Sequence, residues 1–254
     1  MSGLLQNKVC LVTGASRGIG AAIAAALAAE GAGIGVHYGS NRNAAEKVVE
    51  GLAGNNHAVF AADLSDAAVA PDLVNRVIHS LGRLDVLVNN AGIFKAHDPL
   101  GVSTDQWLQC WREILEVNLI GPAVLCQSAA ASMAAQGGGR IINIGSRGAF
   151  RGEPEGPAYG ASKAGLHSLS QSLAIALAPH NIQVTAVAPG FVETDMASAL
   201  LEGETGDAIR GQSPLNRVAR PDEIAETVRF LATTDAQFLT GAIIDVNGAS
   251  YLRT

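Results

Sequence analysis

A short apolar run beginning at Lys8 is followed by the stretch Thr13-Gly14-Ala15-Ser16-Arg17-Gly18-Ile19-Gly20 and then by an alanine-rich segment. The apolar run predicts a buried strand, and the alanines predict a helix. Glycine lets the chain turn tightly between them and lets backbone N–H groups approach a ligand, while the helix amino terminus carries partial positive charge. The stretch therefore predicts a cradle for a pyrophosphate. Its spacing differs from the commoner Gly-x-Gly-x-x-Gly, and a glycine turn alone can also be plain strand-to-helix geometry.

Strand-like and helix-like segments alternate along the whole chain, which is typical of βαβ units. We expect strands over Lys8–Thr13, Gly33–Tyr38, His57–Ala62, Leu84–Asn89, Gly139–Gly145, Gln183–Ala188 and Ala242–Val246. We expect helices over Gly18–Glu30, Ala44–Leu52, Ala67–Leu81, Thr104–Ala135 (bent at Pro122), Tyr159–Ala178 and Asp222–Thr233, with irregular structure over Phe191–Asn216. The pattern predicts one α/β domain over residues 1–254, a doubly wound Rossmann fold whose seven-stranded parallel sheet has helices on both faces.

The composition favours a compact enzyme over a nucleic-acid or membrane protein. Of 254 residues, 48% are hydrophobic and 16% charged, and the net charge is −6 with lysines and arginines scattered. That distribution gives little support for nucleic-acid binding. The cysteines Cys10, Cys110 and Cys126 are widely spaced in apolar segments, which predicts free thiols in a reducing compartment and no metal site. No segment predicts a signal peptide or a membrane span, so we expect a cytoplasmic protein.

Tyr159 and Lys163 lie one helical turn apart, and Ser146 precedes them at the end of an apolar run. Positions i and i+4 share a helix face, so the Lys163 ammonium can lie beside the Tyr159 phenol. Free tyrosine titrates at about 10, and a neighbouring cation lowers that pKa towards the working range of an acid and base. A Tyr-x-x-x-Lys spacing is, however, also common as a solvated helix pair.

The end of the second predicted strand indicates which nicotinamide cofactor would bind. An acidic residue there would bind a ribose 2′-hydroxyl and repel a 2′-phosphate. The segment Val36–Arg42 contains none, and the first acid is Glu46. Arg17 and Arg42 instead offer positive charge that suits a phosphate. The sequence therefore favours NADP(H) over NAD(H), with solvated surface arginines as the alternative.

Further motifs fall in order with these, namely Asn89-Asn90-Ala91-Gly92, Asn118, Pro189-Gly190 and Thr194. Together they resemble the short-chain dehydrogenase/reductase family over essentially the whole chain. The similarity is nearest to the 3-oxoacyl-carrier-protein reductase type in Ala186–Met196 and Leu239-Thr240-Gly241, stretches that sugar, steroid and secondary-alcohol dehydrogenases share. The resemblance implies hydride transfer between a nicotinamide and a ketone or secondary alcohol, with a 3-oxoacyl thioester as one candidate substrate.

The resemblance assigns catalytic roles to four residues. Ser146 would hydrogen-bond the substrate carbonyl oxygen, and Tyr159 would deliver the proton. Lys163 would lower the tyrosine pKa and bind the ribose hydroxyls, while Asn118 would hold a water that connects Lys163 to solvent. Two donors at the oxygen would stabilise the charge that develops in the transition state. Taken alone, Ser146 and Asn118 could be ordinary structural residues.

The resemblance also implies a cofactor-binding set. Asp63 would contact the adenine, Asn90 and Gly92 the adenosine side, and Thr194 the carboxamide. Asp63 could instead cap the following helix, and Asn89-Asn90 could form a turn. The full set is Gly14, Ser16, Arg17, Gly18, Ile19, Gly20, Arg42, Asp63, Leu64, Asn90, Ala91, Gly92, Tyr159, Lys163, Pro189, Gly190, Val192 and Thr194.

The helices Leu115–Met133 and Ala161–Leu177 carry few charges and could meet partner subunits or pack within one subunit. The resemblance implies a homotetramer. It also implies basic residues where an acyl carrier protein docks, and the corresponding stretches Met133–Gly137 and Ala178–Asn181 lack them. This difference weakens the carrier-protein assignment.

Three arginines near the expected substrate mouth could compensate for the missing basic residues, namely Arg147, Arg151 and Arg210. They could instead pair with Glu153 and Glu155. Two alternative functions also stay open: an NAD(H)-dependent sugar or secondary-alcohol dehydrogenase, and a nucleotide-binding sensor that has the fold without catalysis. A nucleotide-sugar epimerase is disfavoured by the chain length and the glycine spacing.

Overall fold

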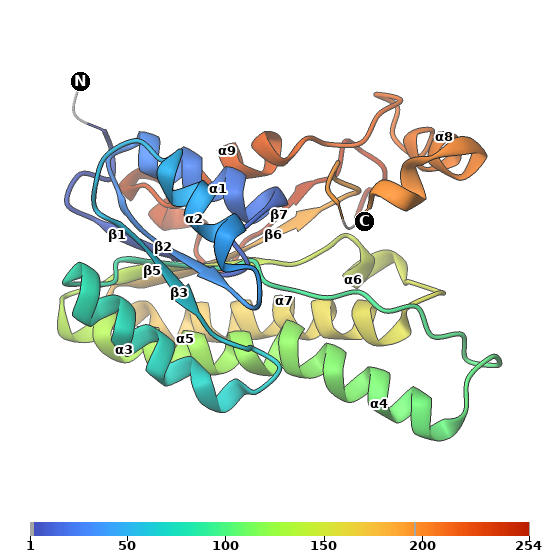
Figure 1. Cartoon of the computed structure of the whole chain (residues 1–254), viewed down its shortest axis with the longest axis horizontal. Coiled ribbons are helices and arrows are strands. Elements are labelled where there is room, and N and C mark those ends of the chain that lie inside the picture. The colour runs from blue at the N-terminus through green and yellow to red at the C-terminus, as the bar shows by residue number, and fades with distance from the viewer. Residues whose placement is uncertain (1–2, 196, 254) are drawn as a thin grey trace.

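The computed structural model describes residues 3–195 and 197–253, so Met196 lies outside the described residues. The strands are β1 (Val9–Val12), β2 (Gly33–Tyr38), β3 (His57–Ala61), β4 (Val86–Asn89), β5 (Gly139–Ile144), β6 (Ile182–Pro189) and β7 (Ile243–Val246). They form one sheet in the order β3-β2-β1-β4-β5-β6-β7, and every neighbouring pair is parallel (Figure 1). The predicted doubly wound α/β fold is confirmed.

Strands β1 and β4 are neighbours near the middle of the sheet, and the direction in which successive strands are added changes between them. Val12 at the end of β1 pairs with Val36 of β2 on one side and with Val88 of β4 on the other. Connections therefore leave in opposite directions from this point, and in open α/β sheets this is where a crevice forms outside the carboxyl ends of the strands. The glycine-rich stretch follows β1 directly into this crevice.

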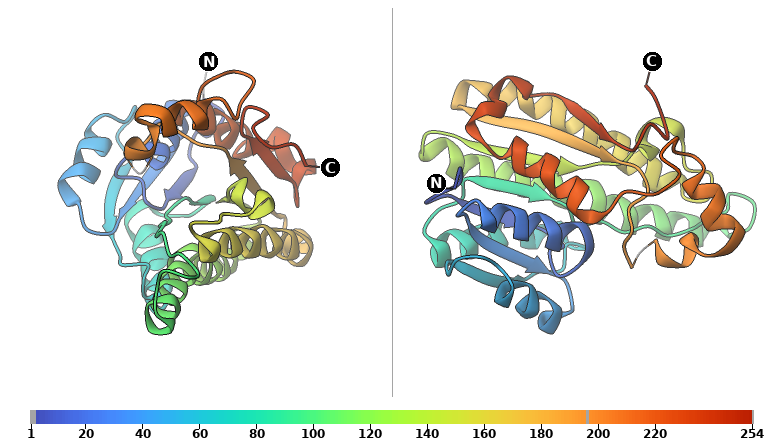
Figure 2. Two further views of the ribbon diagram at one scale, coloured as in Figure 1. Left: turned by 90° about the vertical axis from the view of Figure 1, so that its right-hand side faces the viewer. Right: turned by 90° about the horizontal axis from the view of Figure 1, so that it is seen from above.

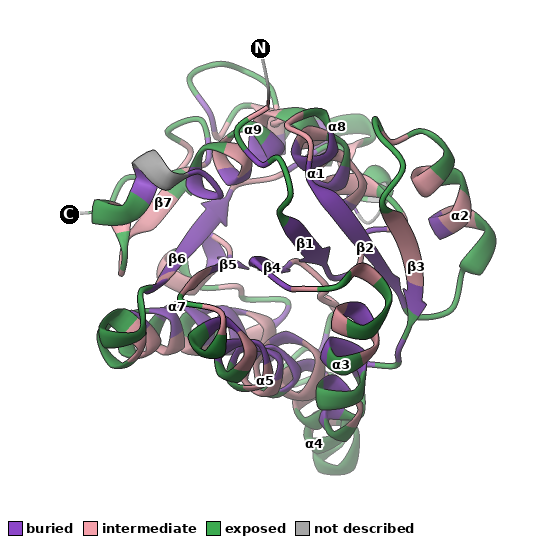
Figure 3. Cartoon of the chain, turned by 90° about the vertical axis from the view of Figure 1, so that its left-hand side faces the viewer, coloured by how far each residue is buried: buried purple, intermediate pink, exposed green. Residues whose placement is uncertain are grey.

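Helices cover both faces of the sheet, as Figures 2 and 3 show. Helices α1 (Gly18–Ala29), α2 (Arg42–Glu50) and α9 (Pro221–Leu231) lie on one face. The other face carries α3 (Ala70–Leu81), α5 (Gly121–Ala135) and α7 (Pro157–Leu177), with α4 (Thr104–Leu115) extending beyond the sheet. Shorter elements are η1 (Ala67–Val69), η2 (Glu116–Ile120), α6 (Gly148–Arg151), η3 (Ala178–His180), η4 (Ser198–Leu201), α8 (Gly203–Arg210) and η5 (Thr234–Leu239).

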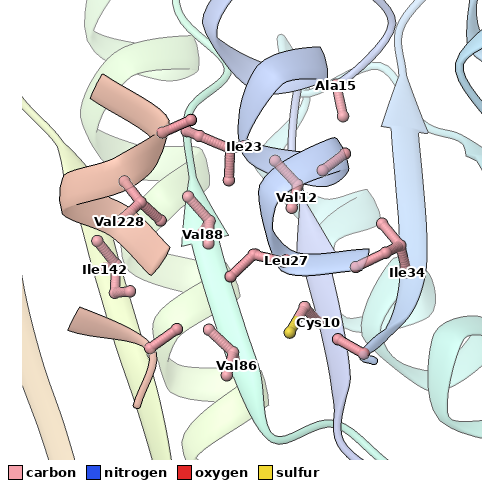
Figure 4. Packing of buried hydrophobic residues seen from close by; sticks show 14 of the residues in the cluster. Cys10, Val12, Ala15, Ile23, Leu27, Ile34, Val86, Val88, Ile142 and Val228 are labelled. Carbon is pink, nitrogen blue, oxygen red and sulfur yellow. The ribbon is translucent and has the colours of Figure 1, made fainter. Parts of the chain in front are cut away.

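Two apolar clusters fill the space between the sheet and its helices. On one face Ile23 and Leu27 of α1 and Val228 of α9 pack against the side chains of β1, β4 and β5 (Figure 4). On the other face α3, α5 and α7 pack on the same strands, around residues such as Leu87 and Ile141. Because both faces of the sheet are buried, the sequences of the central strands are almost continuously apolar.

The segment Phe191–Asn216, which we expected to be irregular, contains the 3-10 turn η4 and the helix α8. Gly203 begins α8 with a φ of 57°, a conformation that glycine adopts without strain. Arg210 in the last turn donates to the Leu201 carbonyl at 3.0 Å, which closes the segment on itself. The expectation was wrong because α8 is short and contains glycines and polar residues, so its sequence shows no clear helical period of apolar residues.

The long helix expected over Thr104–Ala135 is present, but it contains a turn of π-helix at η2. Pro122 follows this turn, and its missing N–H and its ring make regular α-helical bonding impossible there. By length and hydropathy this helix could cross a membrane, yet 50% of its most apolar window is buried inside the molecule. Since it packs on α7 and α3, it serves as a core helix of this fold.

Candidate active site

Helix α7 carries two of the predicted catalytic residues and begins at the carboxyl edge of the sheet. Pro157 occupies its first turn, where a missing N–H has no cost. His97, from the loop after β4, is 1% exposed, and its Nε2 accepts a hydrogen bond from the Ala158 N–H at 3.2 Å. Its Nδ1 donates to the Lys95 carbonyl at 2.8 Å, which fixes the neutral tautomer. His97 thus attaches the loop to the start of α7.

Ser146, Tyr159 and Lys163 come together in one partly buried site. The Ser146 hydroxyl lies close enough to the Tyr159 phenol to lower the pKa of the phenol. The Lys163 ammonium lies 5.8 Å from the centre of the Tyr159 ring and donates to the Ile144 carbonyl at 2.8 Å. Phe94 packs edge-on against the Tyr159 ring at 5.4 Å. The structure therefore brings together the trio that the sequence singled out.

The electrostatics of this trio differ from the prediction. Burial raises the pKa of Tyr159, the hydrogen bond from Ser146 opposes that rise, and Glu153 adds to it. Burial lowers the pKa of Lys163 from 10.5 to about 8. The predicted lowering of the tyrosine pKa by Lys163 is wrong for this structure. The reason is that burial outweighs a cation whose ammonium is directed at the Ile144 carbonyl.

Asn118 lies in the π-helical turn η2 and is fully buried. Its Oδ1 accepts from the Ile93 N–H at 2.8 Å, and its Nδ2 donates to the Ile93 carbonyl at 2.9 Å and to Ser162 Oγ at 3.2 Å. A side chain at Gly92 would meet both Asn118 Oδ1 at 3.3 Å and Lys163 Nζ at 3.4 Å. Asn118 is therefore near Lys163, and its amide holds the loop after β4 against α7.

The glycine stretch forms a tight turn between β1 and α1. Gly14 has a φ of 62°, and a Cβ there would lie 2.9 Å from the Ala91 Cα. Gly18 has a φ of 55°, and a Cβ there would lie 3.3 Å from the Thr194 methyl group, while Gly20 has no room for a side chain beside the Gly14 carbonyl. No side chain caps the amino terminus of α1, so its first N–H groups are available to a ligand.

The turn is fixed from both sides by side chains. Asn90 Nδ2 donates to the Thr13 carbonyl at 2.8 Å, and the Thr13 hydroxyl accepts from the Asn90 and Ala91 N–H groups at 2.9 and 3.0 Å. On the other side His37 Nδ1 accepts from the Gly14 N–H at 3.0 Å. Asn90, predicted to line the adenosine site, thus directs its amide at the glycine turn in this structure.

His37 was not predicted as a site residue, although it stands at the end of β2. Its Nε2 bonds the Ala62 carbonyl at 3.1 Å, so the ring must be neutral to accept from Gly14. Burial lowers the pKa of His37 to about 4, which keeps it neutral near pH 7. A histidine at a strand end carries no distinctive sequence signal, because its role depends on the neighbouring loop.

Another residue missed by the sequence is His167, one turn beyond Lys163 on α7. It is 3% exposed, neither ring nitrogen has a hydrogen-bond partner among residues 3–195 and 197–253, and burial lowers its pKa to about 4. It stacks on Phe150 at 4.9 Å and lies directly over Gly145, where any Cβ would collide with its Nε2. The pair supports the backbone just before Ser146, and only the fold reveals that Gly145 is needed.

The predicted adenosine and phosphate residues lie around the crevice, mostly exposed. Arg17 is 3.8 Å from Asp195, and Arg42 donates to Glu46 at 2.8 Å. Asp63 accepts from the Ser65 N–H and hydroxyl at 3.0 and 2.7 Å, and these bonds lower its pKa. Ser16 and Ile19 line the glycine turn, and Leu64 is buried in the core below.

The loop after β6 closes the other side of the crevice. Pro189 ends β6, and the Gly190 N–H donates to the Val246 carbonyl at 3.1 Å. A Cβ on Gly190 would lie 3.1 Å from Asn247, so the loop packs closely on the chain after β7. Val192 forms a bridge with Ala219, and Thr194 reaches Gly18 across the opening.

These surroundings fit a dinucleotide. Glycines leave space that a Cβ would fill, the amino terminus of α1 is uncapped, and the loop carrying Thr194 faces the glycine turn. In the described part of the chain, no three His, Cys, Asp or Glu side chains are grouped so as to hold a metal ion. The site therefore suits a nicotinamide cofactor.

Comparisons with known proteins agree with this geometry. A family model described as "Enoyl-(Acyl carrier protein) reductase" matches residues 14–249. An uncharacterized oxidoreductase of Methylorubrum extorquens is 40% identical over 248 residues, which cover 96% of this chain and 98% of that protein. The 3-oxoacyl-[acyl-carrier-protein] reductase FabG of Aquifex aeolicus is 40% identical over 251 residues, covering 97% of this chain and 98% of the relative. That of Staphylococcus aureus is 40% identical over 249 residues, covering 97% and 99%.

The fold and the site define an oxidoreductase that depends on a nicotinamide cofactor. The chain belongs to the short-chain dehydrogenase/reductase family.

Gly14→Ala should weaken NADPH binding by about tenfold or more and destabilise the fold by about 1–3 kcal/mol, because the new Cβ meets Ala91 in a left-handed conformation. Gly51→Ala is the control, since Gly51 has a φ of −89° and its Cβ would make only ordinary contacts, the nearest at 3.5 Å. NADPH fluorescence titration and thermal unfolding measure both effects. Equal NADPH affinities in the Gly14→Ala and Gly51→Ala variants would contradict a pyrophosphate cradle at the glycine turn.

Lys163→Met should make the protein more stable than the wild type at pH 7, by about 1–3 kcal/mol, because a buried ammonium is replaced by an apolar group. The folded pKa of about 8 lies below the unfolded value of 10.5, so the folded state binds fewer protons between these values. Wild-type stability therefore rises with pH through this window, and the advantage of the variant shrinks. Denaturant unfolding of both proteins at several pH values tests this. A difference that is constant from about pH 7 to 10 would contradict it.

Proposed function

We propose that this protein is an NADP(H)-dependent oxidoreductase that interconverts a ketone and a secondary alcohol on a small substrate. A 3-oxoacyl thioester is the leading candidate, because the relatives from Aquifex aeolicus and Staphylococcus aureus are named 3-oxoacyl-[acyl-carrier-protein] reductases. The observation that carries the proposal is the meeting of Ser146, Tyr159 and Lys163 at the carboxyl edge of the sheet. The nicotinamide, when bound, supplies or accepts the hydride.

The side chains of the site handle the oxygen and its proton. Because the Ser146 and Tyr159 hydroxyls lie close together, we expect both to donate hydrogen bonds to the carbonyl oxygen of a bound substrate. The raised pKa of Tyr159 keeps the phenol protonated at neutral pH, so it can give a proton to the developing alkoxide. Lys163 stabilises the phenolate left behind, and Asn118 maintains the loop beside the ammonium. Donors that act on charge developing in the transition state lower the barrier most.

The preference for NADP(H) rests on the two exposed arginines. The side chains of Arg17 and Arg42 are 72% and 68% exposed, and among the described residues their only ion-pair partners are the exposed carboxylates Asp195 and Glu46. Surface pairs of this kind contribute about 0–1 kcal/mol, so either arginine can exchange its partner for a phosphate. No acidic residue at the end of β2 opposes a phosphate. An NAD(H)-dependent dehydrogenase is the alternative.

We also propose that the whole chain acts as one domain within a cytoplasmic homotetramer. Exposed apolar side chains support subunit contacts: Ile175 on α7 is 81% exposed and Ile120 beside α5 is 43% exposed. Docking of an acyl carrier protein has less support, because the stretches Met133–Gly137 and Ala178–Asn181 lack basic residues. A carrier-free thioester would then be the better substrate.

Tyr159→Phe should lower turnover of a 3-oxoacyl thioester such as acetoacetyl-coenzyme A by about 10²–10⁴-fold, because the proton donor is lost. NADPH binding should be nearly unchanged. Tyr251→Phe is the matched control, since its hydroxyl makes only a 3.5 Å contact with the Phe150 carbonyl. Steady-state kinetics with NADPH and fluorescence titration measure the two effects. Full activity in Tyr159→Phe would show that the mechanism is wrong.

Arg17→Gln and Arg42→Gln should each weaken NADPH binding by about tenfold and leave NADH binding unchanged, because only NADPH carries the 2′-phosphate. Arg76→Gln removes a comparable exposed arginine, paired with Asp72 on α3, and serves as the control. The dissociation constants of NADPH and NADH are measured for the wild type and for the three arginine variants. Tighter binding of NADH than NADPH by the wild type would favour the NAD(H) alternative.

A further inference from the structure

Arg147 directly follows Ser146 and is buried, with 3% of its surface exposed. Its Nη2 donates to Gln212 Oε1 at 2.5 Å, and its guanidinium lies 5.1 Å from the centre of the Phe191 ring. A guanidinium carries five N–H donors and a full charge. In the described part of the chain, no carboxylate lies within 4.0 Å of it. Arg147 is thus a buried cation without an ion-pair partner.

A second guanidinium points at the same oxygen. Arg151, at the end of α6, donates to Gln212 Oε1 at 2.9 Å and also forms no ion pair with a described residue. Two like charges therefore converge on one neutral amide oxygen. Burial lowers the pKa of Arg147, and the charge of Arg151 lowers it further. A buried cation is costly without a counter-charge, so an anion beside this pair would be strongly stabilised.

The nearby acids form no ion pair with Arg147 in the described part of the chain. Glu153 attracts both Arg147 and Arg151 from outside ion-pair distance, and burial raises the pKa of Glu153. Glu223 belongs to the same region, but both of its oxygens are held by Arg217 at 2.7 and 2.6 Å. The positive charge at Arg147 is therefore available to a ligand.

A cavity of about 80 Å³ adjoins Arg147. Its walls are mainly apolar, and the Ser213 hydroxyl on its lining already donates to the Gly248 carbonyl at 2.6 Å. One water needs about 10–15 Å³ of such space, so the cavity has room for a group of several heavy atoms. The lining includes Arg147, Phe191, Ile209, Ser213, Leu215 and Asn247.

We propose that Arg147, assisted by Arg151 and Gln212, binds the carboxylate of the substrate, so that the enzyme acts on oxo acids and hydroxy acids. This inference rests on the ketone and alcohol chemistry of the proposed function, and it favours a free acid over the 3-oxoacyl thioester, which has no free carboxylate. Arg147 adjoins Ser146, and its N–H donates to the Pro189 carbonyl at 2.9 Å, on the loop that faces the cofactor crevice. Arg147 therefore belongs to the same edge of the sheet as Ser146, the residue directly before it in the chain. A planar guanidinium pairs well with a carboxylate through two parallel hydrogen bonds.

The test compares acids with their uncharged esters. Reduction of 2-, 3- and 4-oxopentanoate and of their methyl esters by NADPH is measured in the wild type and in two variants. The wild type should prefer at least one acid over its ester by about thirtyfold or more in kcat/KM, mainly through KM. Gln212→Glu places a carboxylate of the same size between the two guanidinium groups and should abolish this preference. Arg147→Met should do the same.

Gln127→Glu makes the same charge change at an exposed position on α5 and should keep the preference. Because Gln212→Glu preserves volume, it remains informative if Arg147→Met fails to fold. Equal use of acids and esters by the wild type, or an unchanged preference in Gln212→Glu, would overturn the proposal.

Two further measurements distinguish failure of the proposed function from failure of the proposed carboxylate site. If NADPH binds but neither the acids nor the esters nor a panel of neutral ketones is reduced, the proposed function fails. Calorimetric titration with 4-oxopentanoate then tests the site directly. Binding that Gln212→Glu weakens would support the carboxylate site, and equal affinity in both proteins would refute it.

Discussion

The active site depends on the attachment of α7 to the carboxyl end of β5. Three contacts make this attachment: Lys163 Nζ donates to the Ile144 carbonyl at 2.8 Å, His167 lies against Gly145, and Asn143 Nδ2 donates to Ser170 Oγ at 2.8 Å. Consecutive turns of α7 thus contact three consecutive residues around the end of β5, namely Asn143, Ile144 and Gly145. Since Ser146 follows this strand and Tyr159 precedes Lys163 by one turn, the serine and the tyrosine must meet at the same edge of the sheet.

Burial at this attachment also sets the protonation of the catalytic pair. It raises the pKa of Tyr159 and lowers that of Lys163 to about 8, so both groups are shifted towards their neutral forms. A neutral phenol is the form that donates a proton to an alkoxide. An ammonium with a pKa near 8 keeps most of its charge at pH 7 and can still respond to charge that develops on the phenol. The cation therefore acts on the phenolate after proton transfer more than on the resting phenol.

The sequence predicted the sheet, most helices and the meeting of Ser146, Tyr159 and Lys163, because these depend on local patterns. The strand Gly33–Tyr38 matches its predicted bounds, and Tyr159 and Lys163 lie together because helical spacing requires it. The supporting residues could not be predicted. Gly145 has a reason to be glycine only once His167 packs on it, and His37 gains its role only from the loop beside it. The direction of the Tyr159 pKa was missed for the same reason, since burial arises from tertiary packing.

The cofactor half and the substrate half of the site depend on different features of the chain, and this difference affects substrate specificity. The cofactor half is built mainly from backbone, with glycines that admit the ligand and an uncapped helix end. The proposed substrate half is built from side chains of separate segments: Arg147 and Arg151 around α6, and Gln212 after α8. These side chains lie outside the attachment of α7 to β5, so they can change without moving Ser146 or Tyr159. Relatives at 40% identity can therefore share the hydride chemistry and differ in substrate.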